Sequence, residues 1–303
     1  MASRVLAAVL AVGMGAGTVA AQSQSPALPY TPHRIVSSDG TALAVQEWGN
    51  RSGPAILFIH GSWQSHLSWV RQVEDPALLR EFRLVTFDLR GHGASDKPVG
   101  DAFYKPAKPW ADDVAAIIAA LDLRRPTVVA WSYGGRVVGD YLTVHGSRGL
   151  GAINFVAATT SSAQREFFGP GVATLGPGSS EDLATMIRGT IDFLRACFER
   201  QPDEAQFQTI LAYTMATPRT TRVGMAGRVA AYEPVLRALD LPVLVTQGER
   251  DPLIMPALSR WTASVVPGAV LSLYEGVGHS PFFEDAERFN RELAELARRA
   301  RRE

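Results

Sequence analysis

Short, mainly apolar runs recur along the chain, as is typical of strands that are buried on both faces of a parallel sheet. These runs cover residues 55–59, 84–87, 127–129, 152–157, 242–247 and 269–274. Two further runs alternate apolar and polar residues on either side of Asp39-Gly40, at 33–37 and 42–48, and predict an antiparallel hairpin. Apolar residues at helical spacing occupy the segments between strands, at about 68–81, 111–121, 256–265 and 285–302. Strands that alternate with helices predict an α/β fold, with a mostly parallel sheet covered by helices on both faces.

This alternation stops in the middle of the chain. Residues from about 159 to 235 contain a Gly/Pro-rich loop, 169–178, followed by helical patterns without a convincing strand. Strand patterns resume at residue 242. We therefore predict a helical cap at 159–235, inserted into a core made of residues 22–158 and 236–303.

The N-terminus has the three parts of a secretory signal peptide. Arg4 precedes a charge-free apolar stretch, 5–19, and the small-x-small sequence Val19-Ala20-Ala21 follows before Gln22. A membrane anchor is the alternative, but the apolar run is shorter than ~18 residues and contains three glycines. We predict that residues 1–21 are removed by cleavage after Ala21. The mature protein is then periplasmic or secreted and has no stable membrane anchor.

The composition excludes several classes of function. The 303 residues include 30 Lys+Arg and 30 Asp+Glu with no basic stripe, so the chain lacks the positive field that nucleic-acid binding requires. Cys197 is the single cysteine, which excludes an intrachain disulfide and a cysteine-based zinc cluster. Its helical surroundings indicate a buried thiol and not a nucleophile. No H-E-x-x-H motif occurs, and we expect neither a metal nor a cofactor.

The stretch 127–138, TVVAWSYGGRVV, places a serine between a predicted strand and a predicted helix. This is the layout of a nucleophile elbow, in which the serine lies on a sharp, strained turn. Ala130 and Gly134, two positions before and after Ser132, are small enough to avoid a collision across such a turn. Small residues around a serine also occur by chance in ordinary loops, so the stretch alone does not identify a nucleophile.

Polar residues with complementary chemistry follow three of the predicted strands. Ser132 follows 127–129, Glu249 and Asp251 follow 242–247, and His279 follows 269–274. Catalytic groups of an open parallel sheet gather outside the carboxyl ends of its strands, so these side chains are expected at one edge. A serine hydroxyl needs a histidine to remove its proton, and the histidine needs an acid to fix its tautomer. The sequence therefore predicts a triad, with Asp251 favoured over Glu249 because Glu249 lies closer to the strand end.

With these residues in place, the sequence resembles the α/β-hydrolase superfamily. The motifs that carry the resemblance are His60-Gly61, DLRGHGAS at 88–95, WSYGG at 131–135, GERD at 248–251 and GHSPF at 278–282. The chain is most similar to the small esterases, cofactor-free haloperoxidase/perhydrolases and C–C bond hydrolases of this superfamily. It departs from them at Ala130, where the family usually has glycine. The resemblance implies an eight-stranded, mostly parallel sheet with the helical cap inserted after strand six.

The resemblance also implies a role for each motif residue. Ser132 is expected to be the nucleophile, His279 the general base and then acid, and Asp251 the carboxylate that orients the histidine. The oxyanion hole is expected to use the backbone N–H groups of Tyr133 and Ser62. The remaining histidines are expected to pack or to support their loops.

These roles predict a secreted serine hydrolase that cleaves carboxylic esters of small or medium hydrophobic acids through an acyl-enzyme on Ser132. Trp63 and Trp131 adjoin the oxyanion and nucleophile positions and are expected to wall the substrate pocket, with the cap as its roof. A lactonase, a perhydrolase and a C–C bond hydrolase are open alternatives that would use the same residues. A ligand-binding receptor on this fold is the alternative without catalysis. Aspartate replaces the serine in haloalkane dehalogenases and epoxide hydrolases, so those activities are disfavoured.

Overall fold

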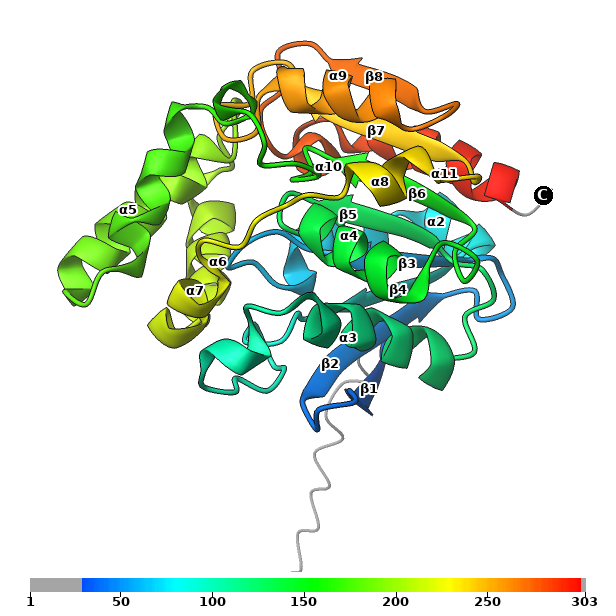
Figure 1. The fold of residues 1–303 in the computed structure, drawn as a ribbon, viewed down its shortest axis with the longest axis horizontal. Helices are drawn as coiled ribbons and strands as arrows, with labels where there is room; N and C mark the ends of the chain where they lie inside the picture. Colours follow the sequence, from blue (N-terminus) through cyan, green and yellow to red (C-terminus); the bar gives the residue numbers. More distant parts are fainter. Residues whose placement is uncertain (1–28, 301–303) are drawn as a thin grey trace, which may run out of the picture.

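The computed structural model describes residues 29–300, and the predicted signal peptide lies outside them. Eight strands form one sheet in the order β1-β2-β4-β3-β5-β6-β7-β8 (Figure 1). The strands are β1 (Thr31–Val36), β2 (Ala42–Gly49), β3 (Ala55–Ile59), β4 (Arg83–Phe87), β5 (Thr127–Trp131), β6 (Ala152–Val156), β7 (Val243–Gly248) and β8 (Val270–Tyr274). β2 pairs antiparallel with β1 and β4, and all the other pairs are parallel. The predicted α/β fold with a mostly parallel eight-stranded sheet is confirmed.

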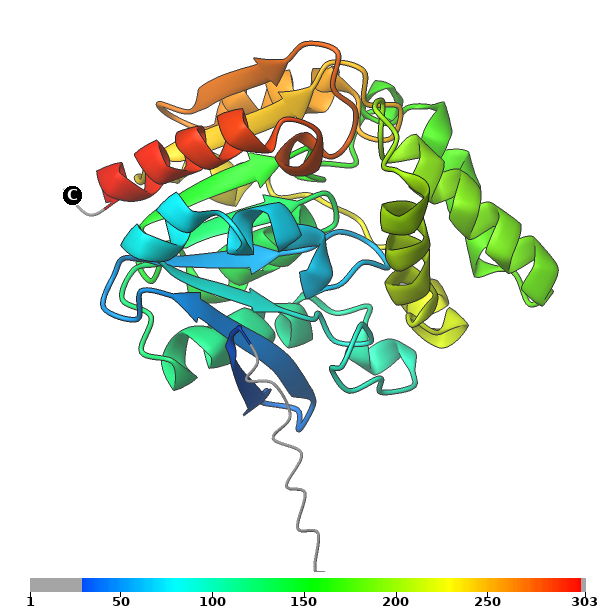
Figure 2. The ribbon, with the colours of Figure 1, turned by 180° about the vertical axis from the view of Figure 1, so that it is seen from behind.

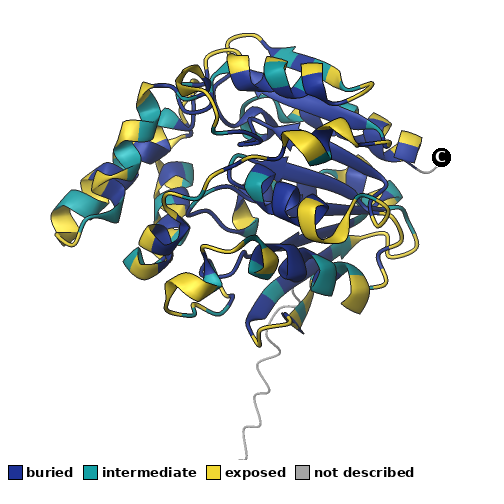
Figure 3. Cartoon of the chain, in the orientation of Figure 1, coloured by how far each residue is buried: buried dark blue, intermediate teal, exposed yellow. Residues whose placement is uncertain are grey.

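Helices cover both faces of the sheet, as the alternating pattern predicted. One face carries α3 (Ala107–Ala120), α4 (Gly134–His145), α8 (Glu233–Arg237) and α9 (Pro256–Val265). The other face carries α1 (Val70–Val73), α2 (Pro76–Glu81), α10 (Pro281–Glu284) and α11 (Ala286–Ala300) (Figure 2). The central strands β3, β5, β6 and β7 are buried, the edge strands β1 and β8 are partly exposed, and the outer sides of the helices are exposed (Figure 3). No helix of residues 29–300 is both long and apolar enough to cross a membrane.

The helix predicted over 68–81 is interrupted, and this is a correction to the prediction. A 3-10 turn (His66–Trp69) leads into α1, and α2 begins separately at Pro76. Proline lacks a backbone N–H and cannot continue a preceding helix, but it suits the first helical position. The Asp75 carboxylate caps α2 by accepting from the N–H groups of Ala77 at 2.8 Å and Leu78 at 2.9 Å. The apolar spacing that continues through this segment therefore belongs to two short helices.

Helices occupy the connection between β6 and β7, where the sequence predicted a cap. Three 3-10 segments (Arg165–Phe167, Pro170–Leu175 and Pro177–Ser179) precede α5 (Leu183–Ala196), α6 (Glu204–Met215) and α7 (Arg219–Met225). These helices stand together at one side of the sheet (Figures 1 and 2). The segment that leaves the core and the segment that re-enters it lie side by side, because Ser161 and Ala231 form an antiparallel bridge.

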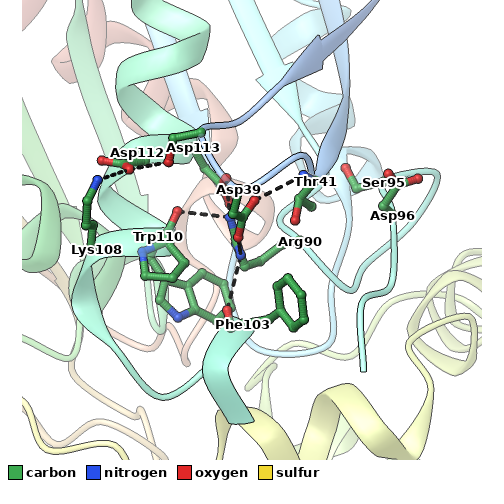
Figure 4. A network of polar contacts seen from close by, with 12 residues as sticks. Asp39, Thr41, Arg90, Ser95, Asp96, Phe103, Lys108, Trp110, Asp112 and Asp113 are labelled. Atoms are coloured by element: carbon green, nitrogen blue, oxygen red, sulfur yellow. Dashed lines mark hydrogen bonds and ion pairs between the residues drawn. The ribbon is translucent and has the colours of Figure 1, made fainter. Parts of the chain in front are cut away.

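A buried arginine fixes the loop that follows β4. Arg90 donates from Nε and Nη2 to both carboxylate oxygens of Asp113 on α3, each at 2.7 Å, and from Nη1 to Asp39 at 2.7 Å (Figure 4). Burial alone would raise the pKa of Asp39, but the hydrogen bonds from Arg90 and Thr41 and the charge of Arg90 together outweigh burial and lower that pKa to about 2. Removing one partner of a buried ion pair costs about 3–5 kcal/mol. The pairs therefore hold the β4 loop, which adjoins the candidate site, against α3 and the β1–β2 turn.

Candidate active site

Ser132 lies on a strained turn between β5 and α4. Its φ is 53°, in the left-handed region that residues other than glycine rarely adopt. Its N–H donates to the Val156 carbonyl at 3.0 Å, and its own carbonyl accepts from the N–H groups of Gly135 at 3.0 Å and Thr159 at 2.9 Å. A Cβ at Gly134 would lie 2.7 Å from the Ile59 carbonyl oxygen, so this position must be glycine. The turn has the geometry that the small residues predicted.

Asp251 and His279 meet although 28 positions separate them in the sequence. Asp251 follows β7, His279 follows β8, and the distance from His279 Nδ1 to Asp251 Oδ2 is 2.7 Å. The other carboxylate oxygen accepts from the N–H groups of Leu253 at 2.8 Å and Ile254 at 3.0 Å. When a carboxylate accepts the hydrogen bond of Nδ1–H, the other ring nitrogen of a neutral histidine, Nε2, carries no proton and can take one. Glu249, the alternative acid, is exposed.

One cavity brings together most of the predicted site residues. Its volume is about 380 Å³, and its lining includes Ser132, His279, Ser62, Trp63 and Tyr133. This volume lies within the range of small-molecule sites, about 300–1,000 Å³. Cap residues and the loop after β7 supply apolar walls, among them Phe168, Val172, Leu175, Phe193, Met225, Leu253 and Ile254. In residues 29–300, no group of three or more histidine, cysteine or acidic side chains is placed to hold a metal ion.

Two residues that line this cavity, Ser62 and Tyr133, have candidate hydrogen-bond donors in their backbone. Within the part of the chain that the structure describes, the N–H groups of Ser62 and Tyr133 donate to no other group. Tyr133 directly precedes α4, where the helix dipole favours negative charge. The loop that carries Ser62 touches the nucleophile turn, since a Cβ at Gly61 would lie 3.1 Å from Ser132 Cβ. Both residues predicted for the oxyanion hole thus line the same cavity as Ser132, and their backbone N–H groups are available to a bound molecule.

A protein-family model described as "Alpha/beta hydrolase family" matches residues 56–292, most of the chain. The chain belongs to the alpha/beta hydrolase family.

Relatives of this hydrolase include esterases and a haloperoxidase. A candidate aryl esterase from Burkholderia cenocepacia has a solved structure that is 35% identical, with a TM-score of 0.86, over 90% of this chain and 100% of the other. Esterase RhEst1 from Rhodococcus sp. ECU1013 is 32% identical, with a TM-score of 0.82, over 88% and 98% of the two chains. Non-heme chloroperoxidase CPO-A1 from Kitasatospora aureofaciens is 27% identical over 85% of this chain and 96% of its own. These relatives support a hydrolase activity on this fold.

Buried histidines support the loop around Trp63, which has a positive φ of 63°. His92 Nδ1 donates to the Arg90 carbonyl at 2.9 Å, and its Nε2 accepts from the Trp63 N–H at 3.2 Å. Burial lowers the pKa of His92 to about 3, so the ring is neutral in this hydrolase near pH 7. His60 is likewise buried with its pKa lowered by burial to about 4. These histidines hold loops, as the sequence indicated.

Trp131 does not line the cavity of Ser132, and its prediction as a pocket wall is wrong. Successive side chains of a strand point to opposite faces, so Trp131 points away from the nucleophile side, into the core with Trp69 and Phe282. It lines instead a separate groove of about 680 Å³ between α6 and the α10–α11 segment. Its indole N–H donates to the His279 carbonyl at 2.9 Å, so it supports the backbone of that histidine.

Sequence reasoning missed three arginines that line the cavity: Arg136, Arg222 and Arg228. A signal existed for Arg136, because it lies in the first turn of α4, directly after the turn that carries Ser132. Arg222 on α7 and Arg228 after it reach the site only through the folding of the cap, and no local pattern indicates this.

Proposed function

We propose that this alpha/beta hydrolase is a serine carboxylesterase that acts through an acyl-enzyme on Ser132. The observation that carries the proposal is the pairing of His279 with a buried Asp251 in the same cavity as a serine on a strained elbow. The esterases among the relatives support the same class of reaction. The signal-peptide pattern of residues 1–21 supports a periplasmic or secreted location for the mature enzyme.

The proposed mechanism assigns a role to each of these groups. His279 Nε2 takes the proton of Ser132 Oγ while that oxygen attacks the ester carbonyl. The N–H groups of Ser62 and Tyr133 stabilise the negative charge that develops on the carbonyl oxygen. The imidazolium then gives its proton to the departing alcohol, and Asp251 stabilises the charged ring. Water, activated by the same histidine, releases the acid and restores the serine.

The cavity suits an ester of modest size. A volume of about 380 Å³ with walls mainly of aliphatic and aromatic side chains fits a small or medium apolar acid together with an aryl or short alkyl alcohol. The description of one relative as an aryl esterase supports aryl esters as the first substrates to test.

The test is hydrolysis of 4-nitrophenyl esters of increasing acyl length by the mature protein, with a lactone and a β-diketone in the same panel. Ser132→Ala removes the nucleophile and is expected to lower kcat by a factor of about 10⁴ or more. Ser264→Ala, a change at an exposed serine on α9, is the matched control and should leave the rate unchanged. Wild-type rates with Ser132→Ala, or faster turnover of the lactone or β-diketone than of any ester, would refute the proposal.

A further inference from the structure

The cavity of Ser132 has a positively charged lining. Arg136, Arg222 and Arg228 line it, whereas none of its lining residues is an aspartate or glutamate. A concave site with charges of one sign and apolar walls concentrates the electric field on whatever it binds. A bound anion would interact with a cation of this lining that the protein itself does not already neutralise.

Arg228 is neutralised by an acid of the core. It forms an ion pair with Asp140 on α4, and both side chains are almost fully buried. Its Nη1 also donates to the Tyr133 hydroxyl at 3.0 Å. Asp140 accepts a further hydrogen bond from the Tyr232 hydroxyl at 2.7 Å. This arginine is part of a closed network and needs no ligand.

Arg222 is bound by groups of the cap, although it has no acidic partner in the described part of the chain. Its Nε donates to the Thr217 carbonyl at 3.0 Å, Nη1 to the Gly178 carbonyl and the Thr190 hydroxyl at 2.7 Å each, and Nη2 to the Thr214 carbonyl at 2.9 Å. With 1% of the residue exposed, no face of the guanidinium is open to a bound molecule.

Arg136 is different, because most of its donors are unused. Within residues 29–300 it forms no ion pair, and its one hydrogen bond runs from Nη1 to the Arg228 carbonyl. A guanidinium has five N–H donors in a planar fork that matches a carboxylate. Burial, with the nearby charge of Arg228, lowers the pKa of Arg136, as expected for a cation without a counter-ion. The side chain is half-buried, so a ligand in the cavity has access to it.

The position of Arg136 sets where an anion would lie. Arg136 lies in the first turn of α4, directly after the turn that carries Ser132, and both residues line the same cavity. Its guanidinium carbon lies 6.0 Å from the centre of the Tyr133 ring. A group bound by Arg136 would therefore lie in the same cavity of about 380 Å³ as the scissile carbonyl.

We infer that the preferred substrates are esters that carry a carboxylate on the acid or the alcohol part, and that Arg136 binds this carboxylate. The inference rests on the proposed function, since it needs Ser132 as the nucleophile. The alternative role for Arg136 is purely structural, as a support for the chain at residue 228. That role would not distinguish charged substrates from neutral ones.

The test compares esters that differ only in charge. One pair is 3-carboxyphenyl butanoate and its neutral amide, 3-carbamoylphenyl butanoate; the other is mono-(4-nitrophenyl) adipate and its terminal amide. Charge-assisted hydrogen bonds predict that kcat/KM of the anionic ester exceeds that of the amide by about ten- to hundredfold in at least one pair. Raising the salt concentration should reduce this ratio in the wild-type enzyme. The wild-type ratio also keeps the inference testable if a variant does not fold.

Substitutions then locate the effect. Arg136→Gln should bring the ratio to about one, mainly through KM, and Arg136→Lys should retain part of the preference. Arg260→Gln removes an equal charge from an exposed site on α9 and should leave the ratio unchanged. A ratio near one in the wild type, or a ratio that Arg136→Gln does not lower, overturns the inference while neutral esters are still hydrolysed. If no ester of either kind is hydrolysed, the proposed function itself has failed.

Discussion

The orientation of the candidate catalytic histidine depends on a single carboxylate. The Asp251 carboxylate accepts a hydrogen bond from Nδ1–H of His279 and also accepts from two backbone N–H groups. These contacts oppose a flip of the histidine ring and a change of its tautomer. Both side chains are almost completely removed from water. A hydrogen bond in such a setting is electrostatically stronger than in solvent, which makes the acid a sensitive position.

We predict that Asp251→Asn lowers kcat for a neutral aryl ester by a factor of about 10⁴ with a small change in KM. The asparagine amide can donate to Nδ1 and so favours the tautomer with its proton on Nε2, which then cannot accept the proton of Ser132. Steady-state kinetics measures the effect. Glu249→Gln, at the exposed acid of the same loop, is the control. A larger loss for Glu249→Gln than for Asp251→Asn would transfer the role to the glutamate.

Sequence order was sufficient to bring the candidate triad together, because parallel strands deliver the residues that follow them to one edge. Ser132, Asp251 and His279 need only this rule. Trp131 shows its limit, since a residue next to the nucleophile in sequence can point to the opposite face of the sheet, as the alternation of strand side chains requires here. Arg136 could have been found from its place in the first helical turn after the serine elbow. Arg228 could not, because its contact with Asp140 spans 88 positions and depends on how the cap folds.

At the scale of elements, the end of β7 packs directly against the loop that carries His279. A Cβ on Gly248 would lie 1.9 Å from the Gly278 carbonyl oxygen and 2.5 Å from that of Val277. Both obstacles are backbone atoms, so neither can move aside by changing rotamer. The contact sets the separation of the Asp251 and His279 loops.

We therefore expect Gly248→Ala to lower the free energy of unfolding by about 1–3 kcal/mol and to lower kcat further than this loss of stability explains. Urea unfolding and ester hydrolysis measured on the same preparation separate the two effects. Gly276→Ala is the matched change, in the loop that carries His279. The φ of Gly276 is +65°, but nothing lies within 4 Å of the added Cβ. This change should therefore lower the free energy of unfolding by about 1–2 kcal/mol, from backbone strain alone. Equal losses of activity in the two variants would contradict this account.

The bounds of helices and strands were predictable where a single hydrophobic pattern extends over a segment. They were less predictable where that pattern and a local capping or breaking signal disagree. The strands follow from mainly apolar runs or, for β1 and β2, from alternating runs, and the structure places all of them within a few residues of the expected bounds. The segment 68–81 keeps helical spacing across a break, so the pattern predicted one helix. The local signal of Asp75-Pro76, a cap followed by a residue that cannot extend a helix, decides the structure.

At the scale of the molecule, cap and core meet at the loop of the proposed oxyanion hole. Trp63, next to Ser62, packs against Phe193 of α5 with ring centres 4.9 Å apart and the rings tilted by 58°, and the Arg222 guanidinium carbon lies 4.5 Å from the centre of the Trp63 ring. The Trp63 carbonyl accepts from the Thr217 hydroxyl at 3.2 Å. The cap therefore contacts both the ring and the backbone of a residue in a strained conformation.

This contact predicts that Arg222→Met impairs catalysis as well as folding. The change leaves several buried carbonyls without donors and removes the cation from the Trp63 ring, so we expect the free energy of unfolding to fall by about 3 kcal/mol. If the cap holds the oxyanion loop, kcat of the folded enzyme also falls, by about tenfold or more, as one donor shifts. Thr217→Val keeps the arginine and loses one hydroxyl, so both effects should be smaller. Lower stability with an unchanged kcat for the folded fraction would show that the cap covers the site without positioning it.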